Sequence, residues 1–146
     1  MKKTITIEFD GCICRQPCDP DYEGKAEGPP VPGAMAFIVE ALDRYCVVVC
    51  SPRAVNQGGI GVMWDYLRDG MAEYYAGQIR QAWPEGQESA IRAAAHNKAS
   101  DTVRRIDFVK ARPVAHLHID PRAYRFVGVW PSMDAVEAFS DEAYRP

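Results

Sequence analysis

The sequence predicts a single α/β domain, built on a mostly parallel, Rossmann-like sheet flanked by helices. Short apolar runs with strand periodicity alternate with longer segments of helical periodicity, which is typical of β-α-β units. The early strand-like runs are rich in Ile and Val, as in strands that are covered on both faces. A chain of 146 residues suits one domain with a sizeable core, so we expect 1–146 to form one unit.

Composition limits the possible classes of protein. Hydrophobic residues make up 47% and charged residues 25% of the chain, which is typical of a globular protein. The net charge of −3 does not indicate a general affinity for nucleic acid. No apolar run approaches the roughly 20 residues of a membrane span, so we expect no membrane partner and a cytoplasmic location. Five cysteines, an odd number, are expected to be reduced thiols in that compartment.

The first third of the chain predicts two strands, a loop and a helix. Residues 4–9 alternate apolar and polar side chains, as a strand does, and end at Asp10. Prolines and glycines then predict an irregular, flap-like loop over residues 12–32. A buried helical stripe, carried by Ala34, Phe37, Ile38, Ala41, Leu42 and Tyr45, predicts an amphipathic helix. The sequence CVVVC, residues 46–50, predicts a second strand.

The rest of the chain predicts more helix, followed by short strands. A helical pattern starts near Ile60, with Gly70 as a candidate C-cap, and residues 71–104 predict a helical insertion in two pieces separated at 83–86. Three strand-like runs and a final helix follow, at residues 106–109, 115–119, 124–129 and 132–139. Ser132 is the expected N-cap of that helix.

Polar residues follow several of the predicted strands. Ligands of open parallel sheets bind outside the carboxyl ends of the strands, so these positions are the candidate site. They are Glu8, Asp10, Ser51, Lys110, Arg112 and Asp120. Carboxylates suit a hard cation such as Mg²⁺, while a hydroxyl and cationic side chains suit phosphate oxygens. Arg53, beside Ser51, could contact an anion, but a surface salt bridge is the expectation for it.

These residues resemble the motifs of the haloacid dehalogenase-like (HAD-like) hydrolases. The first motif of that family, an apolar strand followed by Asp-x-Asp-Gly-Thr, stands here as Glu8-Phe9-Asp10-Gly11-Cys12. Its second motif, a Ser or Thr after an apolar strand, corresponds to VVVC-Ser51. Lys110 and Arg112-Pro113 stand near its third motif, and HLHI-Asp120 resembles its last.

The resemblance implies a small phosphatase without a cap domain that uses Mg²⁺ to hydrolyse phosphomonoesters. It places Glu8 at the nucleophile position, Asp10 as the proton donor and acceptor, and Glu8, Asp10 and Asp120 around the metal. Ser51 and Lys110 or Arg112 would bind the phosphate of a phosphorylated substrate. Glu8 stands where the family has aspartate, so turnover is expected to be slow.

Two alternatives to an active phosphatase stay open. One is a catalytically inactive module of the same fold that retains affinity for phosphate or metal. The other is an interaction protein in which residues 71–104 form a partner surface or a homodimer. Hydrolysis, binding and oligomer measurements separate the three.

Overall fold

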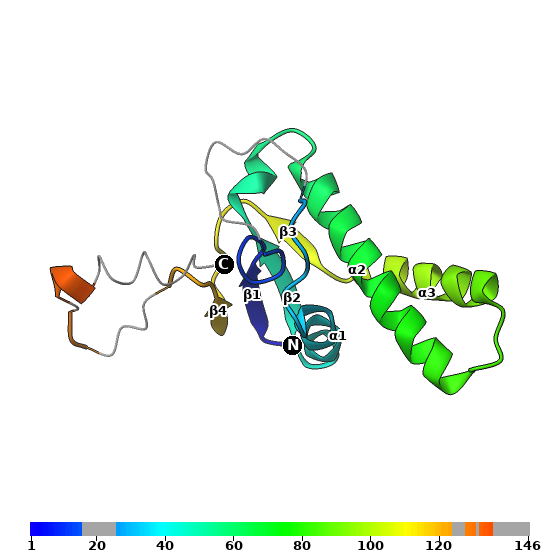
Figure 1. Ribbon diagram of the computed structural model, residues 1–146. Helices are drawn as coiled ribbons and strands as arrows, with labels where there is room; N and C mark the ends of the chain where they lie inside the picture. The colour runs from blue at the N-terminus through cyan, green and yellow to red at the C-terminus, as the bar shows by residue number, and fades with distance from the viewer. Residues whose placement is uncertain (16–25, 124–127, 131, 136–146) are drawn as a thin grey trace.

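Four parallel strands form the centre of the computed structural model, which describes residues 1–15, 26–123, 128–130 and 132–135 (Figure 1). They are β1 (Thr4–Glu8), β2 (Cys46–Cys50), β3 (Asp107–Val109) and β4 (Leu117–Ile119). Their spatial order is β3-β2-β1-β4, and all three pairings are parallel. The predicted Rossmann-like α/β fold is confirmed.

The helices lie in the crossover connections between the strands. They are α1 (Ala34–Arg44), the short 3₁₀ turn η1 (Pro52–Val55), α2 (Gly59–Ala82) and α3 (Glu88–Val103). Helix α1 begins at Ala34, as predicted, but its buried face is rotated from the predicted stripe. Met35 is buried and Phe37 is 47% exposed, because α1 buries the face that carries Met35, Ile38 and Leu42.

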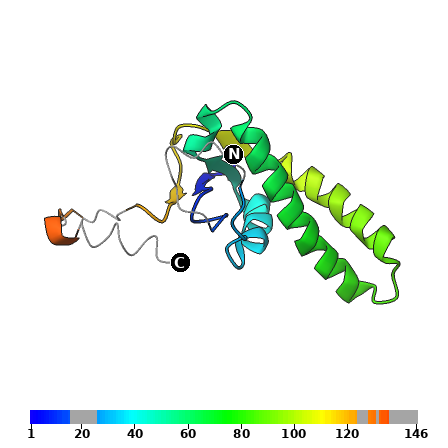
Figure 2. The same cartoon turned by 45° about the horizontal axis from the view of Figure 1, so that its top comes forward.

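Helix α2 runs unbroken through Gly70, so the predicted C-cap at that residue is wrong. A Cβ at position 70 would lie 2.5 Å from the Met35 methyl carbon, which shows that this glycine serves close packing between α1 and α2. The predicted break at 83–86 is confirmed, since it separates α2 from α3. The two helices form an antiparallel hairpin that projects away from the sheet (Figure 2).

The hydrophobic core lies between the sheet and these helices. Ile5 and Ile7 of β1 alternate with Thr6 and Glu8, so apolar side chains occupy one face of the strand. The strand and helix residues that form the core with them include Val47, Val49, Ile38, Leu42, Met63, Leu67, Met71, Ile91 and Val103. The core therefore fixes the position of the strand ends, where the candidate site lies.

Several predictions concern the end of the chain. The strands predicted at 106–109 and 115–119 are confirmed as the shorter β3 and β4. The Ser132 hydroxyl accepts a hydrogen bond from the Ala135 amide at 3.1 Å, as the predicted N-cap requires. Residues 16–25 of the loop, 124–127 of the third strand-like run and the last helix beyond 135 lie outside the described residues. Within the described part, no helix is long and apolar enough to cross a membrane.

Candidate functional site at the carboxyl edge of the sheet

The topology brings the predicted site residues to one edge of the sheet. Strand β1 ends at Glu8, and Ser51, Lys110 and Asp120 directly follow the last residues of β2, β3 and β4. All four strands are parallel, so their carboxyl ends share this edge.

Gly11 permits a close approach between the segments that follow β1 and β4. Its φ of +89° lies in the left-handed region, which favours glycine. A Cβ at this position would lie only 2.8 Å from Cγ of Pro121. The Asp-Gly pair after β1 therefore fixes the spacing between the Asp10 segment and the Asp120 segment.

Asp10 forms a buried ion pair with Arg53. Arg53 Nε lies 3.0 and 2.9 Å from the two carboxylate oxygens, and its Nη2 lies 2.8 Å from Oδ1. The side chains are 9% exposed for Arg53 and 2% for Asp10, and the guanidinium also lies over the Phe9 ring. The surface salt bridge predicted for Arg53 is therefore wrong, because η1 folds this side chain inward onto Asp10.

Ser51 connects the same pair to the end of β2. Its hydroxyl lies 3.4 Å from Asp10 Oδ2, to which it donates, and accepts from the Arg53 amide at 3.2 Å. Ser51 is the N-cap of η1, and Pro52 occupies the first position of that turn, where proline is favoured. Ser51 is fully buried, so in this arrangement it orients Asp10 and Arg53.

Glu8 is also buried at this edge, and its carboxylate makes fewer hydrogen bonds than that of Asp10. Its residue exposure is 5%, and Oε1 has no hydrogen-bond partner in the described structure. Burial raises the pKa of Glu8 above its ordinary value of 4.5, and the neighbouring Asp10 charge adds to this, whereas Arg122 and Arg112 oppose it. This carboxylate therefore has unused capacity for a cation or a proton.

Asp120 has two arginine neighbours. Arg112 forms an ion pair with its Oδ2, and the Arg122 backbone amide donates to its Oδ1 at 2.7 Å. The Arg122 guanidinium also lies 3.6 Å from Asp120 Oδ1 and 3.4 Å from Glu8 Oε2. Arg122 thus bridges carboxylates from neighbouring strands, whereas Lys110 is exposed at the same edge.

Cys12 occupies the position after Gly11. Burial and the Glu8 charge raise the pKa of its thiol to about 11, although Arg122 opposes the shift. Cys12 is therefore a protonated thiol near neutral pH and not the activated thiolate of a cysteine nucleophile. Cys12, Cys46 and Cys50 form no disulfide in the described structure, and Cys18 lies outside the described residues, so the reduced state stays a prediction.

The carboxylates fit Mg²⁺ in part. In the described structure, no three His, Cys, Asp or Glu side chains converge as a metal-binding group. Both Asp10 oxygens already accept from Arg53, so that side chain has little capacity for a metal. Asp120 is engaged as well, because its Oδ2 pairs with Arg112 and its Oδ1 accepts from the Arg122 amide. Glu8 Oε1 is a buried oxygen without a donor in the described structure. Mg²⁺ commonly binds one or two carboxylates and completes its shell with water and phosphate, so Glu8 suits it, whereas Asp120 would have to exchange Arg112 for the metal.

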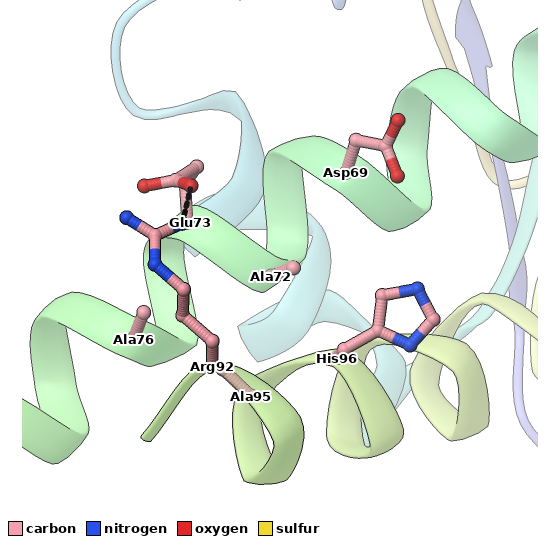
Figure 3. Close-up of a pocket in the computed structure, with 7 residues that line it drawn as sticks. All are labelled: Asp69, Ala72, Glu73, Ala76, Arg92, Ala95 and His96. Carbon is pink, nitrogen blue, oxygen red and sulfur yellow. Dashed lines mark hydrogen bonds and ion pairs between the residues drawn. The ribbon is translucent and has the colours of Figure 1, made fainter. Parts of the chain in front are cut away.

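Two cavities lie outside this cluster. One, of about 220 Å³, lies between α2 and α3 and is lined by Asp69, Ala72, Glu73, Ala76, Arg92, Ala95 and His96 (Figure 3). Arg92 and Glu73 form an ion pair with each other, and Asp69 forms one with Arg68. Most charged groups that line this cavity therefore already have a partner. The other, of about 270 Å³, is apolar and adjoins the carboxyl edge through Cys12 and Ile119.

Sequence reasoning missed the contribution of two arginines. Arg53 and Arg122 each lie two residues after a predicted site residue, Ser51 and Asp120. A tight turn after a strand end returns such a residue to the site, as the Arg53 amide bond to Ser51 and the Arg122 amide bond to Asp120 show. A polar residue followed two positions later by arginine was the available signal.

Comparison of the chain with models of known protein families, with curated proteins and with solved structures finds no match.

Proposed function

We propose that this protein hydrolyses phosphomonoesters slowly, with Mg²⁺ held by Glu8 and Asp120 at the carboxyl edge of the sheet. The observation that carries the proposal is that one guanidinium, that of Arg122, lies 3.4 Å from Glu8 Oε2 and 3.6 Å from Asp120 Oδ1. The two carboxylates come from neighbouring parallel strands, share this guanidinium, and include a buried oxygen without a donor. A cation would supply the partner that Glu8 Oε1 lacks, and exposed basic side chains lie at the same edge.

In this proposal, each residue of the site has a separate role. Glu8 supplies the oxygen that attacks phosphorus, and the bond from phosphorus to the ester oxygen breaks as Asp10 gives that oxygen a proton. Water then attacks the phosphorus held on Glu8 and gives a proton to Asp10, so that inorganic phosphate leaves and both carboxyl groups are restored. Lys110 and Arg112 bind phosphate oxygens, for which a guanidinium fork and an ammonium are both suited. Mg²⁺, when bound, offsets the negative charge of the phosphoryl group. The apolar cavity beside Cys12 offers a place for the organic part of the ester.

Glu8 explains why turnover is expected to be slow. Glutamate extends its carboxylate one methylene further than aspartate, and a misplacement of about 1 Å costs on the order of 100-fold in rate. The attack also requires the ionised carboxylate, whereas burial favours the protonated form of Glu8. Activity should therefore rise with pH through the raised pKa of Glu8.

The ion pair between Asp10 and Arg53 favours a second candidate function, phosphate and metal binding without turnover. Proton transfer by Asp10 needs a free carboxyl oxygen, and Arg53 and Ser51 engage both oxygens. If the pair stays closed when the ligand is bound, Asp10 only orients its neighbours. The protein would then bind phosphate esters and leave them intact.

One assay separates the two functions. Hydrolysis of an aryl phosphate with Mg²⁺ is measured for the native protein, Glu8→Asp and Asp10→Asn. The hydrolase proposal predicts slow native turnover, a gain of up to about 100-fold in Glu8→Asp and loss of turnover in Asp10→Asn. Equal rates for all three proteins would refute it. Calorimetric binding of phosphate and Mg²⁺ in that case would establish the binding function.

A further inference from the structure

The apolar cavity of about 270 Å³ lies between the sheet and the start of α1. Its inner wall is formed by core side chains, among them Ile7, Ile13 and Ile38, each at most 3% exposed. None of the residues that line it in the described structure carries a charge. A dry apolar cavity of roughly 150 Å³ can bind benzene, so this one has room for an aromatic ring.

The mouth of the cavity is formed by the first turn of α1 and the residues before it. Pro32, Gly33 and Phe37 line the cavity and are exposed, so the cavity opens to solvent. Phe37 is 47% exposed because α1 turns its other face toward the core. A ring that entered the cavity would cover Phe37, and paired aromatic rings gain contacts beyond simple burial. The cavity therefore suits a ring better than a charged or hydroxyl-rich group.

The cavity lies at the same end of the sheet as the candidate site. Strand β1 runs toward the carboxyl edge and α1 leads back to the start of β2, so the N-terminal turn of α1 lies near that edge. Ile7 and Ile119 pair with each other in the sheet, and both line the cavity. They directly precede Glu8 and Asp120 in the sequence. The cavity and the carboxylates are thus neighbours.

Cys12 lies where the cavity meets the site. It lines the cavity, and its thiol donates to the Ile119 carbonyl oxygen at 3.8 Å. Burial and the nearby Glu8 charge raise the pKa of this thiol to about 11, so Cys12 presents a neutral surface near neutral pH. Glu8 itself points to the other face of the sheet, because side chains alternate along a strand. A ligand held at both places therefore passes over the carboxyl edge at Cys12.

We propose that this cavity binds the ring of an aromatic ligand, and that aryl phosphates are accordingly the substrates of the carboxyl edge. The second part rests on the proposed function, which supplies the phosphate end of the ligand. The apolar wall selects the ring, while polar groups at the edge hold and orient the phosphate. A glycerol or sugar ester would leave its hydroxyl groups without hydrogen-bond partners in the cavity, so it should be a poor ligand.

Binding of naphthol, a ring without phosphate, tests the cavity by itself. Native protein, Ala34→Leu and Ala36→Leu are compared by titration calorimetry. Ala34 lines the cavity, whereas Ala36 is exposed on the same helix and is not among the lining residues. Ala34→Leu fills part of the cavity, so we expect naphthol to bind it about tenfold more weakly than the native protein. The control Ala36→Leu should bind naphthol as the native protein does.

A second variant keeps the test decisive if Ala34→Leu disturbs folding. Phe37→Ala removes the ring at the mouth, and because Phe37 is half-exposed the change should affect the core little. We expect naphthol to bind Phe37→Ala about fivefold more weakly than the native protein. Near-ultraviolet circular dichroism checks that each variant is folded.

Hydrolysis tests the choice of substrate. With Mg²⁺ present, kcat/KM is measured for naphthyl phosphate and for glycerol phosphate, which has no ring. Ala34→Leu should lower kcat/KM for naphthyl phosphate about tenfold, and Ala36→Leu should leave it unchanged. Comparing proteins on the same ester removes the chemical difference between the two leaving groups. No such loss is expected for glycerol phosphate.

The inference is overturned if naphthol binds equally to the native protein, Ala34→Leu and Phe37→Ala, or binds to none of them. Failure of the proposed function gives a different result. Naphthol binding that Ala34→Leu weakens, with no hydrolysis of either ester, would remove the hydrolase and leave the ring site. Hydrolysis of naphthyl phosphate at equal rates by the native protein and Ala34→Leu would keep the hydrolase and remove the selection for a ring.

Discussion

The carboxyl edge of the sheet and the α2–α3 hairpin use charged residues in opposite ways. At the edge, Glu8, Asp10 and Asp120 are buried, and arginines approach them from neighbouring segments. On the hairpin, the charges are exposed and the interior is mostly apolar, with Met71 and Ile91 fully or almost fully buried. The buried hydroxyls of Tyr75 and Thr102 form a hydrogen bond with each other.

The buried charges of the carboxyl edge are expected to lower the stability of the protein, whereas the hairpin interior is expected to raise it. Burying charge is unfavourable unless every group is paired, and Glu8 Oε1 is a buried oxygen without a partner. The hairpin instead buries alanine, isoleucine and methionine side chains, which contribute to stability without such a cost. Functional sites are the usual place for local features that lower stability, so the unsatisfied Glu8 oxygen agrees with the carboxyl edge as the candidate site.

The largest loss of stability is expected when the buried Arg53 side chain is removed from the carboxyl edge. Arg53→Ala should lower the free energy of unfolding by about 3–5 kcal/mol, because it leaves the Asp10 carboxylate buried without its partner. Urea denaturation measures the change. The double variant Asp10→Asn/Arg53→Met removes both charges and should recover much of the loss. If the single and double variants were equally destabilised, the buried charge would not be the cause.

A change in the hairpin interior should act through packing alone. Met71→Ala should cost about 2–5 kcal/mol, since Met71 is fully buried between the hairpin and the rest of the core. The effect should be the same at every pH at which the protein is folded, because no charge is changed. Denaturation at two pH values checks this, and a pH-dependent cost would contradict the assignment.

Glu8→Gln should raise stability at neutral pH by about 1 kcal/mol, since it removes an ionised buried carboxylate. The folded pKa of Glu8 is raised, so its contribution to stability is fully present below its ordinary value of 4.5 and is lost as pH rises through the folded pKa. The stability difference between Glu8→Gln and the native protein should therefore grow with pH above 4.5. A difference that shrinks with pH would show that the Glu8 pKa is lowered in the folded protein.

The smallest effect is expected for an exposed hairpin charge. Arg92 pairs with Glu73 at 3.4 Å and with Glu88 at 2.8 Å, and its side chain is 59% exposed. Arg92→Ala should change the free energy of unfolding by no more than about 0.5 kcal/mol, and high salt should abolish the difference. A cost comparable to that of Arg53→Ala would remove the contrast between the two regions.

Periodicity was sufficient to predict β1 to β4 and the position of α1, because alternation and helical spacing reflect which side chains are buried, but it placed the buried face of α1 incorrectly. It failed at Gly70, where contact with Met35, distant in the sequence, decides the role of the glycine. The positions of the site carboxylates were predictable from the strand ends, because the carboxyl ends of parallel strands share one edge of the sheet. The spacing of two residues marks Arg53 and Arg122 as candidate partners of those carboxylates, but whether each side chain turns inward depends on the folded geometry of the loops.

Mapping ligand binding by amide NMR tests the central claim most directly. Inorganic phosphate and Mg²⁺ are added to the ¹⁵N-labelled protein, and the shift of each assigned amide is recorded. We predict changes at residues 8–12, 51–53, 110–112 and 120–122, with the amides of α2 beyond Gly70 and of α3 unaffected. Changes centred on the hairpin cavity, or no change anywhere at millimolar ligand, would contradict a phosphate and metal site at the carboxyl edge.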